Sequence, residues 1–229
     1  MFTIIAFISQ KGGVGKSTLS QALAREAVVG GLKTKIADLD TQQGTTVDWL
    51  RDRLNAGIQP EIAAESFATA AQALKIAHQY DLLIIDGPAR TSKGTLEIAT
   101  VADLVVQPTG ASRNDLRPAV REFHALVQAG ISKDKLAFAL SRIGTPVEES
   151  EARAYISEAG YSVLDGYLPE RPAYRKAQNG GRSITETSFR NLNSRADELI
   201  QALINRVGDD NGRSVEAETP QHIGRTAVS

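Results

Sequence analysis

The sequence predicts an α/β fold with a doubly wound, mostly parallel sheet and helices on both faces. Apolar runs rich in β-branched residues alternate with segments of helical pattern along most of the 229-residue chain. Most of these runs are apolar at every position, as expected for parallel strands that are covered by helices on both sides. A chain of this length is sufficient for one large domain with a single buried core.

The alternation assigns a residue range to each element. Strands are expected at residues 2–8, 33–39, 81–86, 103–108, 135–140 and 161–168. Helices are expected at residues 17–29, 66–79, 115–129, 148–159 and 188–206. Gly130 and Gly160 stand where two of these helices would end. Residues 1–207 are therefore expected to form one domain, and the polar, aperiodic residues 208–229 a disordered tail.

Composition excludes several classes of site. The chain has 26 basic and 27 acidic residues, so any attraction to nucleic acid must come from a local patch. It has no cysteine, which excludes disulfides, zinc ribbons and iron–sulfur clusters, and its three histidines lie far apart. The sequence shows neither a signal peptide nor an apolar run of spanning length, so a cytoplasmic protein without a membrane segment is expected.

Residues 9–18, "SQKGGVGKST", resemble a phosphate-binding loop that has lost one glycine and gained one lysine. The usual pattern is G-x-x-x-x-G-K-[ST], and Gly15, Lys16 and Ser17 fill its last three places. Gln10 stands at the first glycine and is followed by Lys11. The loop lies between an expected strand and an expected helix, the context in which backbone N–H groups and the helix N-terminus bind phosphate.

Each side chain of the loop has an expected role in nucleotide binding. Lys16 should reach the β- and γ-phosphates, the Ser17 hydroxyl should bind Mg²⁺, and Thr18 should contact the α-phosphate. A glycine-rich turn without function is disfavoured, because strand, loop, lysine and hydroxyls agree. The expected nucleotide-binding residues of the loop are Lys11, Gly12, Gly13, Val14, Gly15, Lys16, Ser17 and Thr18.

Two aspartates are expected to complete the metal and water machinery. Asp86 ends the apolar run "DLLIID" and should hold Mg²⁺ through water at the carboxyl end of its strand. Asp40 ends "KIADLD" in a neighbouring strand and could orient the attacking water and contribute to the metal site. The alternative for Asp40 is a cap of the turn that follows it. Asp38 faces the same side as Asp40 and is expected to support the site.

The motifs "KGGVGKST", "DLDTQQ" and "LLIIDGPA" resemble, in this order and spacing, the deviant Walker-motif ATPases of the ParA/MinD family. The resemblance extends from Met1 to roughly Val207. It implies a P-loop NTPase fold with a deviant Walker A motif, ATP and Mg²⁺ as cofactors, and hydrolysis that is slow without a stimulating partner. It also implies an ATP-sandwich dimer in which Lys11 contacts the phosphates held by the opposite subunit. The alternative for Lys11 is a solvated surface lysine.

The chain departs from the family pattern at two places. The usual "DxDPQ" has become "DLDTQQ", with Thr41 in place of proline, so the loop after Asp40 has lost a rigid residue. The family often has an asparagine after the fifth strand for reading adenine, whereas this chain has Ser141 and Arg142. One of these two must take its place, and Pro169 is the expected contact beneath the base.

Missing residue types and the distribution of charge exclude some branches of the family and favour another. Without cysteine, the chain is no nitrogenase iron protein or iron–sulfur carrier, and residues 208–229 lack the apolar face of a membrane-binding helix. Residues 171–195 carry six basic residues and one acidic residue, which is a footprint for DNA binding without sequence preference. Arg117 and Arg121 are expected to extend it. The expected DNA-binding residues are Arg171, Arg175, Lys176 and Arg190.

The favoured interpretation is a short ParA-like partition ATPase that forms ATP-dependent homodimers and associates with the nucleoid. A ParB-like or adaptor protein would stimulate its hydrolysis, and plasmid or chromosomal DNA would be its cargo. Three alternatives remain open. The same ATPase could position a carboxysome or a chemoreceptor cluster, or it could recruit a relaxase complex in conjugation. A dethiobiotin synthetase-like ligase is disfavoured by Lys11 and the basic segment, and a solvated basic face is the alternative to DNA binding.

Overall fold

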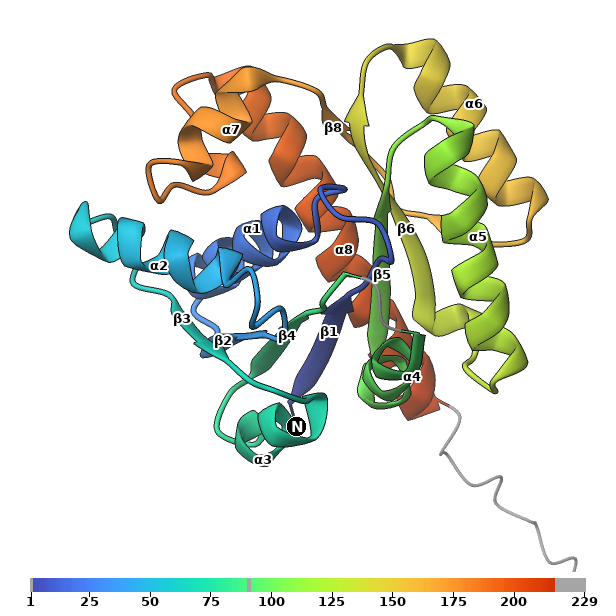
Figure 1. Cartoon of the computed structure of the whole chain (residues 1–229), viewed down its shortest axis with the longest axis horizontal. Coiled ribbons are helices and arrows are strands. Elements are labelled where there is room, and N and C mark those ends of the chain that lie inside the picture. The colour runs from blue at the N-terminus through green and yellow to red at the C-terminus, as the bar shows by residue number, and fades with distance from the viewer. Residues whose placement is uncertain (1, 90–91, 217–229) are drawn as a thin grey trace, which may run out of the picture.

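A parallel sheet forms the centre of the molecule, as the computed structural model of residues 2–89 and 92–216 shows (Figure 1). The strands are β1 Thr3–Phe7, β2 Thr34–Asp38, β3 Ala63–Ser66, β4 Leu82–Asp86, β5 Leu104–Thr109, β6 Leu136–Ile143, β7 Ser162–Val163 and β8 Leu168–Pro169. Their order is β3-β2-β4-β1-β5-β6-β7, and β8 also pairs with β6. All of these described pairs are parallel.

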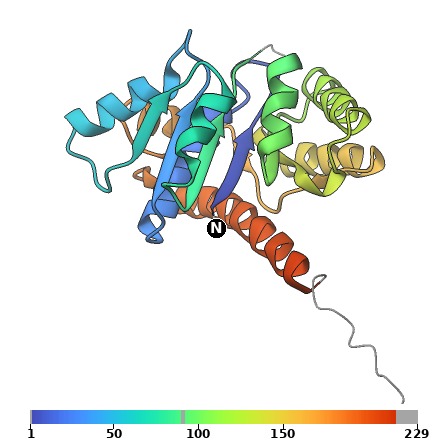
Figure 2. The same cartoon turned by 90° about the horizontal axis from the view of Figure 1, so that it is seen from below.

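Helices cover both faces of the sheet. They are α1 Lys16–Val29, α2 Thr45–Asn55, α3 Ala70–Ala77, α4 Ser92–Val101, α5 Arg113–Gln128, α6 Pro146–Glu158, α7 Pro172–Gln178 and α8 Arg190–Glu216, with short 3₁₀ turns at Lys133–Lys135 and Ile184–Glu186. Helices α3 to α6 pack on one face. Helices α1, α2, α7 and α8 pack on the other, and α8 runs along the sheet in Figure 2. The predicted doubly wound α/β fold is confirmed.

The strands are apolar throughout because their side chains enter two separate cores. In β1, Ile4 and Ala6 belong to the core under α3 to α6, whereas Ile5 and Phe7 belong to the core under α1 and α8. Alternation of side chains across a strand produces this division, and burial on both faces removes the polar positions that a one-sided sheet would show.

The register brings the functional residues to one edge. Phe7 of β1 pairs with Asp86 of β4, and Asp38 of β2 pairs with the same Asp86. The strands are parallel, so their carboxyl ends meet here, and ligands of open α/β sheets bind outside this edge. The phosphate loop follows β1 directly.

Several elements differ from the sequence prediction. The expected strand at 161–168 is two short strands, because Gly166 lies at φ +74° with the backbone of Leu199 about 3.0 Å from where a Cβ would stand. Strand β3 and helices α2, α4 and α7 were not predicted. The expected helix at 66–79 is shorter, Ala70–Ala77.

The C-terminal helix is longer than the sequence predicted. Helix α8 continues to Glu216, so the boundary expected at residue 208 falls inside a helix, and the first part of the expected tail is helical. Residues 217–229 of that tail lie outside the described residues. Among the helices that are described, none is long and apolar enough to cross a membrane.

Candidate nucleotide-binding site

The glycines of the phosphate loop are required for two different reasons. Gly15 caps α1 at φ +111°, and a Cβ there would stand 3.0 Å from Ser141 Oγ. This position therefore needs glycine both for its backbone angle and for its close packing. At Gly12 and Gly13 a Cβ would meet no atom within 4 Å, so the loop has an open cradle on that side. Such a cradle fits phosphate oxygens bound by backbone N–H groups.

The two lysines of the loop have opposite environments. Lys16 is 8% exposed, and burial lowers its pKa while the carboxylates of Asp86, Asp40 and Glu122 oppose that shift. Its ammonium group therefore faces three acids in the absence of a ligand. Lys11 lies at the surface with 49% of its side chain exposed. One lysine is thus placed inside the site and the other faces outward.

Asp86 fits the role of a magnesium-site carboxylate. Its Oδ2 accepts a hydrogen bond from Thr46 Oγ1 at 2.7 Å, and the Ser17 hydroxyl lies close enough to favour its charged form. Its Oδ1 is buried without a hydrogen bond of ordinary geometry. Burial raises the pKa of Asp86 to about 6, a cost that a cation would relieve. When Mg²⁺ is bound, Ser17 and Asp86 would hold it, directly or through water.

Asp38 and Asp40 organise the loop before α2. The Asp38 carboxylate is 1% exposed and accepts the N–H groups of Asp40 at 2.9 Å and Thr46 at 3.2 Å. The Asp40 carboxylate accepts the N–H of Gln43 at 3.3 Å, which is the turn cap considered as its alternative role. No cluster of three acidic or histidine ligands occurs within the described part of the chain. Roles for Asp40 in holding the metal and orienting water remain predictions.

Glu122 holds the start of the loop at Gln10. The carboxylate of this buried residue on α5 accepts the backbone N–H of Gln10 at 3.3 Å and the side-chain amide of Gln107 at 2.7 Å. Burial raises the pKa of Glu122, and the Gln10 N–H and Lys16 oppose that shift. The start of the loop is therefore tied to α5. The sequence did not reveal this residue, because 112 positions separate it from Gln10.

Asp115, which the sequence analysis also missed, holds Lys11. The Lys11 ammonium forms an ion pair with Asp115 Oδ1, and the Ser112 hydroxyl donates to Oδ2 at 2.6 Å. Burial opposes charge on this carboxyl, yet the hydrogen bonds from Lys11 and Ser112 hold the pKa of Asp115 below its ordinary value. Lys11 is therefore anchored to its own subunit in this structure.

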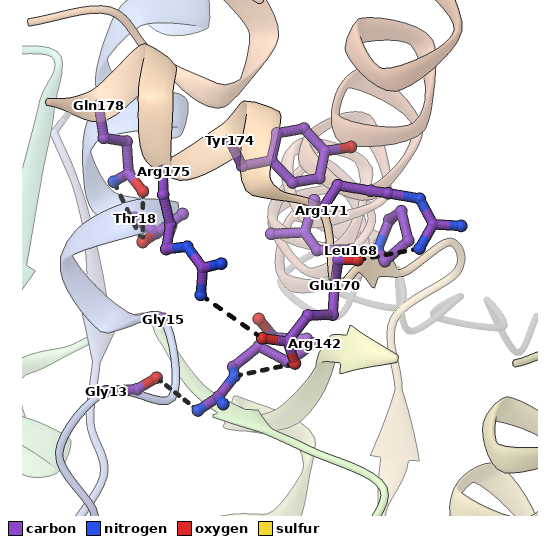
Figure 3. A pocket seen from close by; sticks show the side chains of 12 residues that line it. Gly13, Gly15, Thr18, Arg142, Leu168, Glu170, Arg171, Tyr174, Arg175 and Gln178 are labelled. Atoms are coloured by element: carbon purple, nitrogen blue, oxygen red, sulfur yellow. Dashed lines mark hydrogen bonds and ion pairs between the residues drawn. The ribbon is translucent and has the colours of Figure 1, made fainter. Parts of the chain in front are cut away.

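A cleft of about 300 Å³ opens beside the loop, between α1 and α7 (Figure 3). Arg142 lines it at φ +59°, donating to Gly13 O at 3.3 Å and pairing with Glu170 at 3.5 Å. Positive φ is a conformation that asparagine adopts more readily than arginine, so this backbone is unusual for Arg142. Ser141 and Pro169 also line the cleft, so Arg142 and Ser141, the two candidates for reading adenine, and Pro169, the expected contact beneath the base, all face it. Their contact with adenine remains a prediction.

The basic segment lies at the surface beside this cleft. Arg171, Arg175, Lys176 and Arg190 are all exposed. Arg175 pairs with Glu170 at 3.8 Å (Figure 3), whereas Lys176 and Arg190 form no ion pair within the described residues. Part of the charge is therefore neutralised internally, and part is free to meet an external anion.

The fold and the loop define a P-loop nucleotide-binding domain, and comparisons with known proteins specify the family. Residues 5–224 match the CobQ/CobB/MinD/ParA nucleotide-binding domain model. Because this match spans nearly the whole chain, the protein belongs to that family, as the motifs indicated. The family comprises nucleotide-binding ATPases that include partition proteins and carboxysome-positioning proteins.

Individual relatives are distant. The chain is 27% identical over 192 residues to the maintenance of carboxysome distribution protein A of Gloeobacter kilaueensis, covering 82% of this chain and 86% of that protein. It is 27% identical over 182 residues to the protein ParA of Rhizobium radiobacter, covering 75% and 80%. The fold is similar to that of the septum site-determining protein MinD complexed with Mg-ADP from Pyrococcus horikoshii OT3, with a TM-score of 0.68, 18% identity, and coverage of 96% and 100%.

Proposed function

We propose that this chain is a Mg²⁺-dependent ATPase that forms ATP-sandwich dimers, binds DNA without sequence preference and positions plasmid or chromosomal DNA. The placement of its two loop lysines carries the proposal. Lys16 is buried among three carboxylates, ready to meet phosphate, whereas Lys11 is exposed and supplies a cation that can reach a second subunit. Asp86 and Ser17 would hold Mg²⁺, and Asp40 would orient water.

The ATP dimer would control DNA binding through the size of its basic surface. One subunit offers few unpaired cations in the segment that contains Lys176 and Arg190. Six to ten phosphate contacts are typical of firm non-specific binders at physiological salt. Two subunits joined on one rigid body double the number of contacts, so ATP would raise DNA affinity without touching DNA. A ParB-like or adaptor protein would then stimulate hydrolysis and release the DNA.

A salt titration of binding to two unrelated duplexes, with Mg-ATP and with Mg-ADP, tests the proposal. Binding should be tighter with ATP and equal for both duplexes. Arg175→Ala/Lys176→Ala should flatten the slope of log affinity against log salt by about 2 to 4. A matched control, Lys75→Ala/Lys133→Ala, removes the same charge from the opposite face of the sheet and should leave the slope unchanged. Binding that is equally tight with ADP, or confined to one duplex, would contradict DNA positioning.

The lysines test the dimer separately. Lys16→Ala should abolish nucleotide binding, whereas Lys11→Ala should retain ATP binding and lose ATP-dependent dimers and hydrolysis. Equilibrium binding of a fluorescent ATP analogue together with light scattering measures both properties. Equal loss of ATP binding in the two variants would refute the division of roles.

The likeness to a carboxysome distribution protein favours a second candidate, in which the same ATPase positions a protein assembly. Both candidates use the same ATP and DNA steps and differ in the partner. A centromere-binding partner that stimulates hydrolysis only with its cognate DNA would select DNA positioning, whereas an assembly adaptor that stimulates without centromere DNA would select the second candidate.

A further inference from the structure

A chain of hydrogen bonds, buried at Thr46 and Gln21 and half-buried at Gln178, connects the expected magnesium site with α7, the helix that carries Arg175 and Lys176. Thr46 Oγ1 donates to Asp86 Oδ2 at 2.7 Å, and Gln21 Nε2 donates to Thr46 Oγ1 at 3.4 Å. Gln178 Nε2 then donates to Gln21 Oε1 at 2.9 Å. Gln21 and Thr46 are 1% and 0% exposed, so water does not compete for these groups.

The direction of the chain follows from the charge at its end. A carboxylate only accepts, so the single hydrogen of the Thr46 hydroxyl points to Asp86. The Thr46 oxygen must then accept from Gln21, which fixes the amide nitrogen of Gln21 on that side. The Gln21 oxygen consequently faces Gln178, which must donate. Each member is oriented by the one before it, from β4 through α2 and α1 to α7.

Gln178 is also tied to the phosphate loop. Its Nε2 donates to Thr18 Oγ1 at 3.1 Å, and both residues line the cleft beside the loop (Figure 3). Thr18 is the hydroxyl expected to contact the α-phosphate. Two parts of the nucleotide site, Asp86 and Thr18, therefore meet at one side chain at the end of α7.

We infer that Gln21 and Gln178 are positioning residues, which link the state of the nucleotide and metal site to the placement of Arg175 and Lys176 on α7. The inference rests on the proposed function and adds to it a second control, besides dimer formation, over DNA affinity. The Thr18 hydroxyl also lies 3.3 Å from Gln178 Oε1, to which it can donate, so a phosphate that accepts from Thr18 competes with Gln178 for this hydrogen. A cation on Asp86 competes with Thr46 for the carboxylate lone pairs. Gln178 must then re-satisfy its amide, and α7 has only seven residues to absorb the change.

The test is the ratio of DNA affinities with Mg-ATP and Mg-ADP in Gln21→Met, Gln178→Met and the double variant. Methionine keeps the size of glutamine and removes both hydrogen-bonding groups. Each single variant should lower the ratio by about 2- to 30-fold. The double variant should lower this ratio no further than the more affected single variant does, because both substitutions break the same chain of hydrogen bonds. Light scattering with Mg-ATP should still show wild-type dimers.

Controls separate this coupling from packing and from the proposed function. Gln201→Met removes an exposed glutamine whose amide donates to Asn205 on α8, and it should leave the ratio unchanged. If Gln21→Met fails to fold, the half-buried Gln178→Met carries the test alone. An unchanged ratio in Gln178→Met with intact dimers, or additive losses in the double variant, would overturn the relay while leaving the proposed function standing. A wild-type ratio near one would overturn both.

Discussion

Replacement of Arg53 by methionine should destabilise the protein strongly, because this arginine is a buried charge that donates four hydrogen bonds. Its side chain is 0% exposed, although it lies on α2 near the surface of the fold. Nη1 bonds Glu186 Oε2 at 2.6 Å, and Nη2 bonds Glu186 Oε1 at 3.1 Å. Nε and Nη1 also donate to the carbonyls of Pro60 and Gly181 at 3.1 and 3.2 Å.

The size of the effect follows from what Glu186 retains. Removal of one partner of a buried ion pair costs about 3–5 kcal/mol, since the other charge is left without compensation. Glu186 still accepts the N–H of Ser183 at 2.7 Å and lies 3.5 Å from Arg25 Nε. These contacts place the expected loss for Arg53→Met at the low end, about 3 kcal/mol. In a protein of this size that corresponds to a fall of roughly 6–12 °C in Tm.

The pair also predicts a pH dependence. Burial opposes the charge of Glu186, yet the hydrogen bond from Arg53 and its positive charge lower the pKa of this carboxyl. The native state therefore binds this proton less readily than the unfolded chain does. The stabilisation is present above the ordinary glutamate pKa and is lost as pH falls through the lowered value. Arg53→Met should consequently show a weaker loss of stability with acid than the wild type.

Urea unfolding followed by circular dichroism at pH 7 and pH 4 measures both effects. Arg51→Met is the matched control, because Arg51 is an exposed arginine on the same helix and its loss should cost less than about 0.5 kcal/mol. Arg53→Met/Glu186→Gln should recover part of the stability, since no lone carboxylate remains. A loss below about 1 kcal/mol in Arg53→Met, or one equal to that of Arg51→Met, would refute the reasoning.

Three further substitutions probe the loop and its surroundings. Burial raises the pKa of Asp86 to about 6, so its charge destabilises the ligand-free protein as pH rises to that value. Asp86→Asn should therefore raise the free energy of unfolding at pH 7.5 by on the order of 3 kcal/mol, measured by urea unfolding. It should also remove the dependence of nucleotide affinity on Mg²⁺. Gly181→Ala should cost about 3 kcal/mol or more, because its Cβ would lie 2.3 Å from the backbone N of Arg53, whereas Gly57→Ala, equally left-handed but unobstructed, should cost about 1 kcal/mol. Asp40→Ala should bind Mg-ATP yet lower the partner-stimulated hydrolysis rate by about 10²- to 10⁴-fold, and an unchanged rate would exclude a role in orienting water.

The central strands could be predicted because burial on both faces leaves an unmistakable record in the sequence. In β4 every residue of "LLIID" is buried, and the run ends at Asp86, the carboxylate expected to hold the metal. The phosphate loop was equally readable, since its glycines and hydroxyls are needed locally. Structure could be predicted where it is determined by residues close together in the sequence.

The missed elements have few apolar positions of their own. Helix α2 buries Thr46, Trp49 and Arg53, two of which are polar, so its sequence shows no apolar stripe. Helix α7 has seven residues and buries only Tyr174 and Ala177. Both helices are held by polar contacts with distant parts of the chain, and a pattern based on apolar periodicity does not record such contacts.

Sequence reasoning missed some site residues for the same reason, because they contact distant parts of the chain. Asp115 is separated from Lys11 by 104 positions, and Gln178 is separated from Gln21 by 157. Neither partner belongs to a motif, and each pair forms only because the doubly wound sheet places α5 and α7 beside the loop. Local chemistry predicted roles for the loop lysines and for Asp86, but the partners that restrain such side chains follow from topology.

This restraint changes how the extra lysine of the loop is understood. A surface lysine with no partner would be free to reach a second subunit at once, whereas Lys11 must first leave Asp115. An exposed ion pair contributes little to stability, so the exchange of one anion for another is nearly neutral in free energy. In the dimer proposed above, Asp115 would therefore keep Lys11 close to the loop without opposing its transfer to phosphates that carry more negative charge. Lys16 is buried and has no such freedom, and this difference in exposure is the physical basis for the separate tasks that we propose for the two lysines.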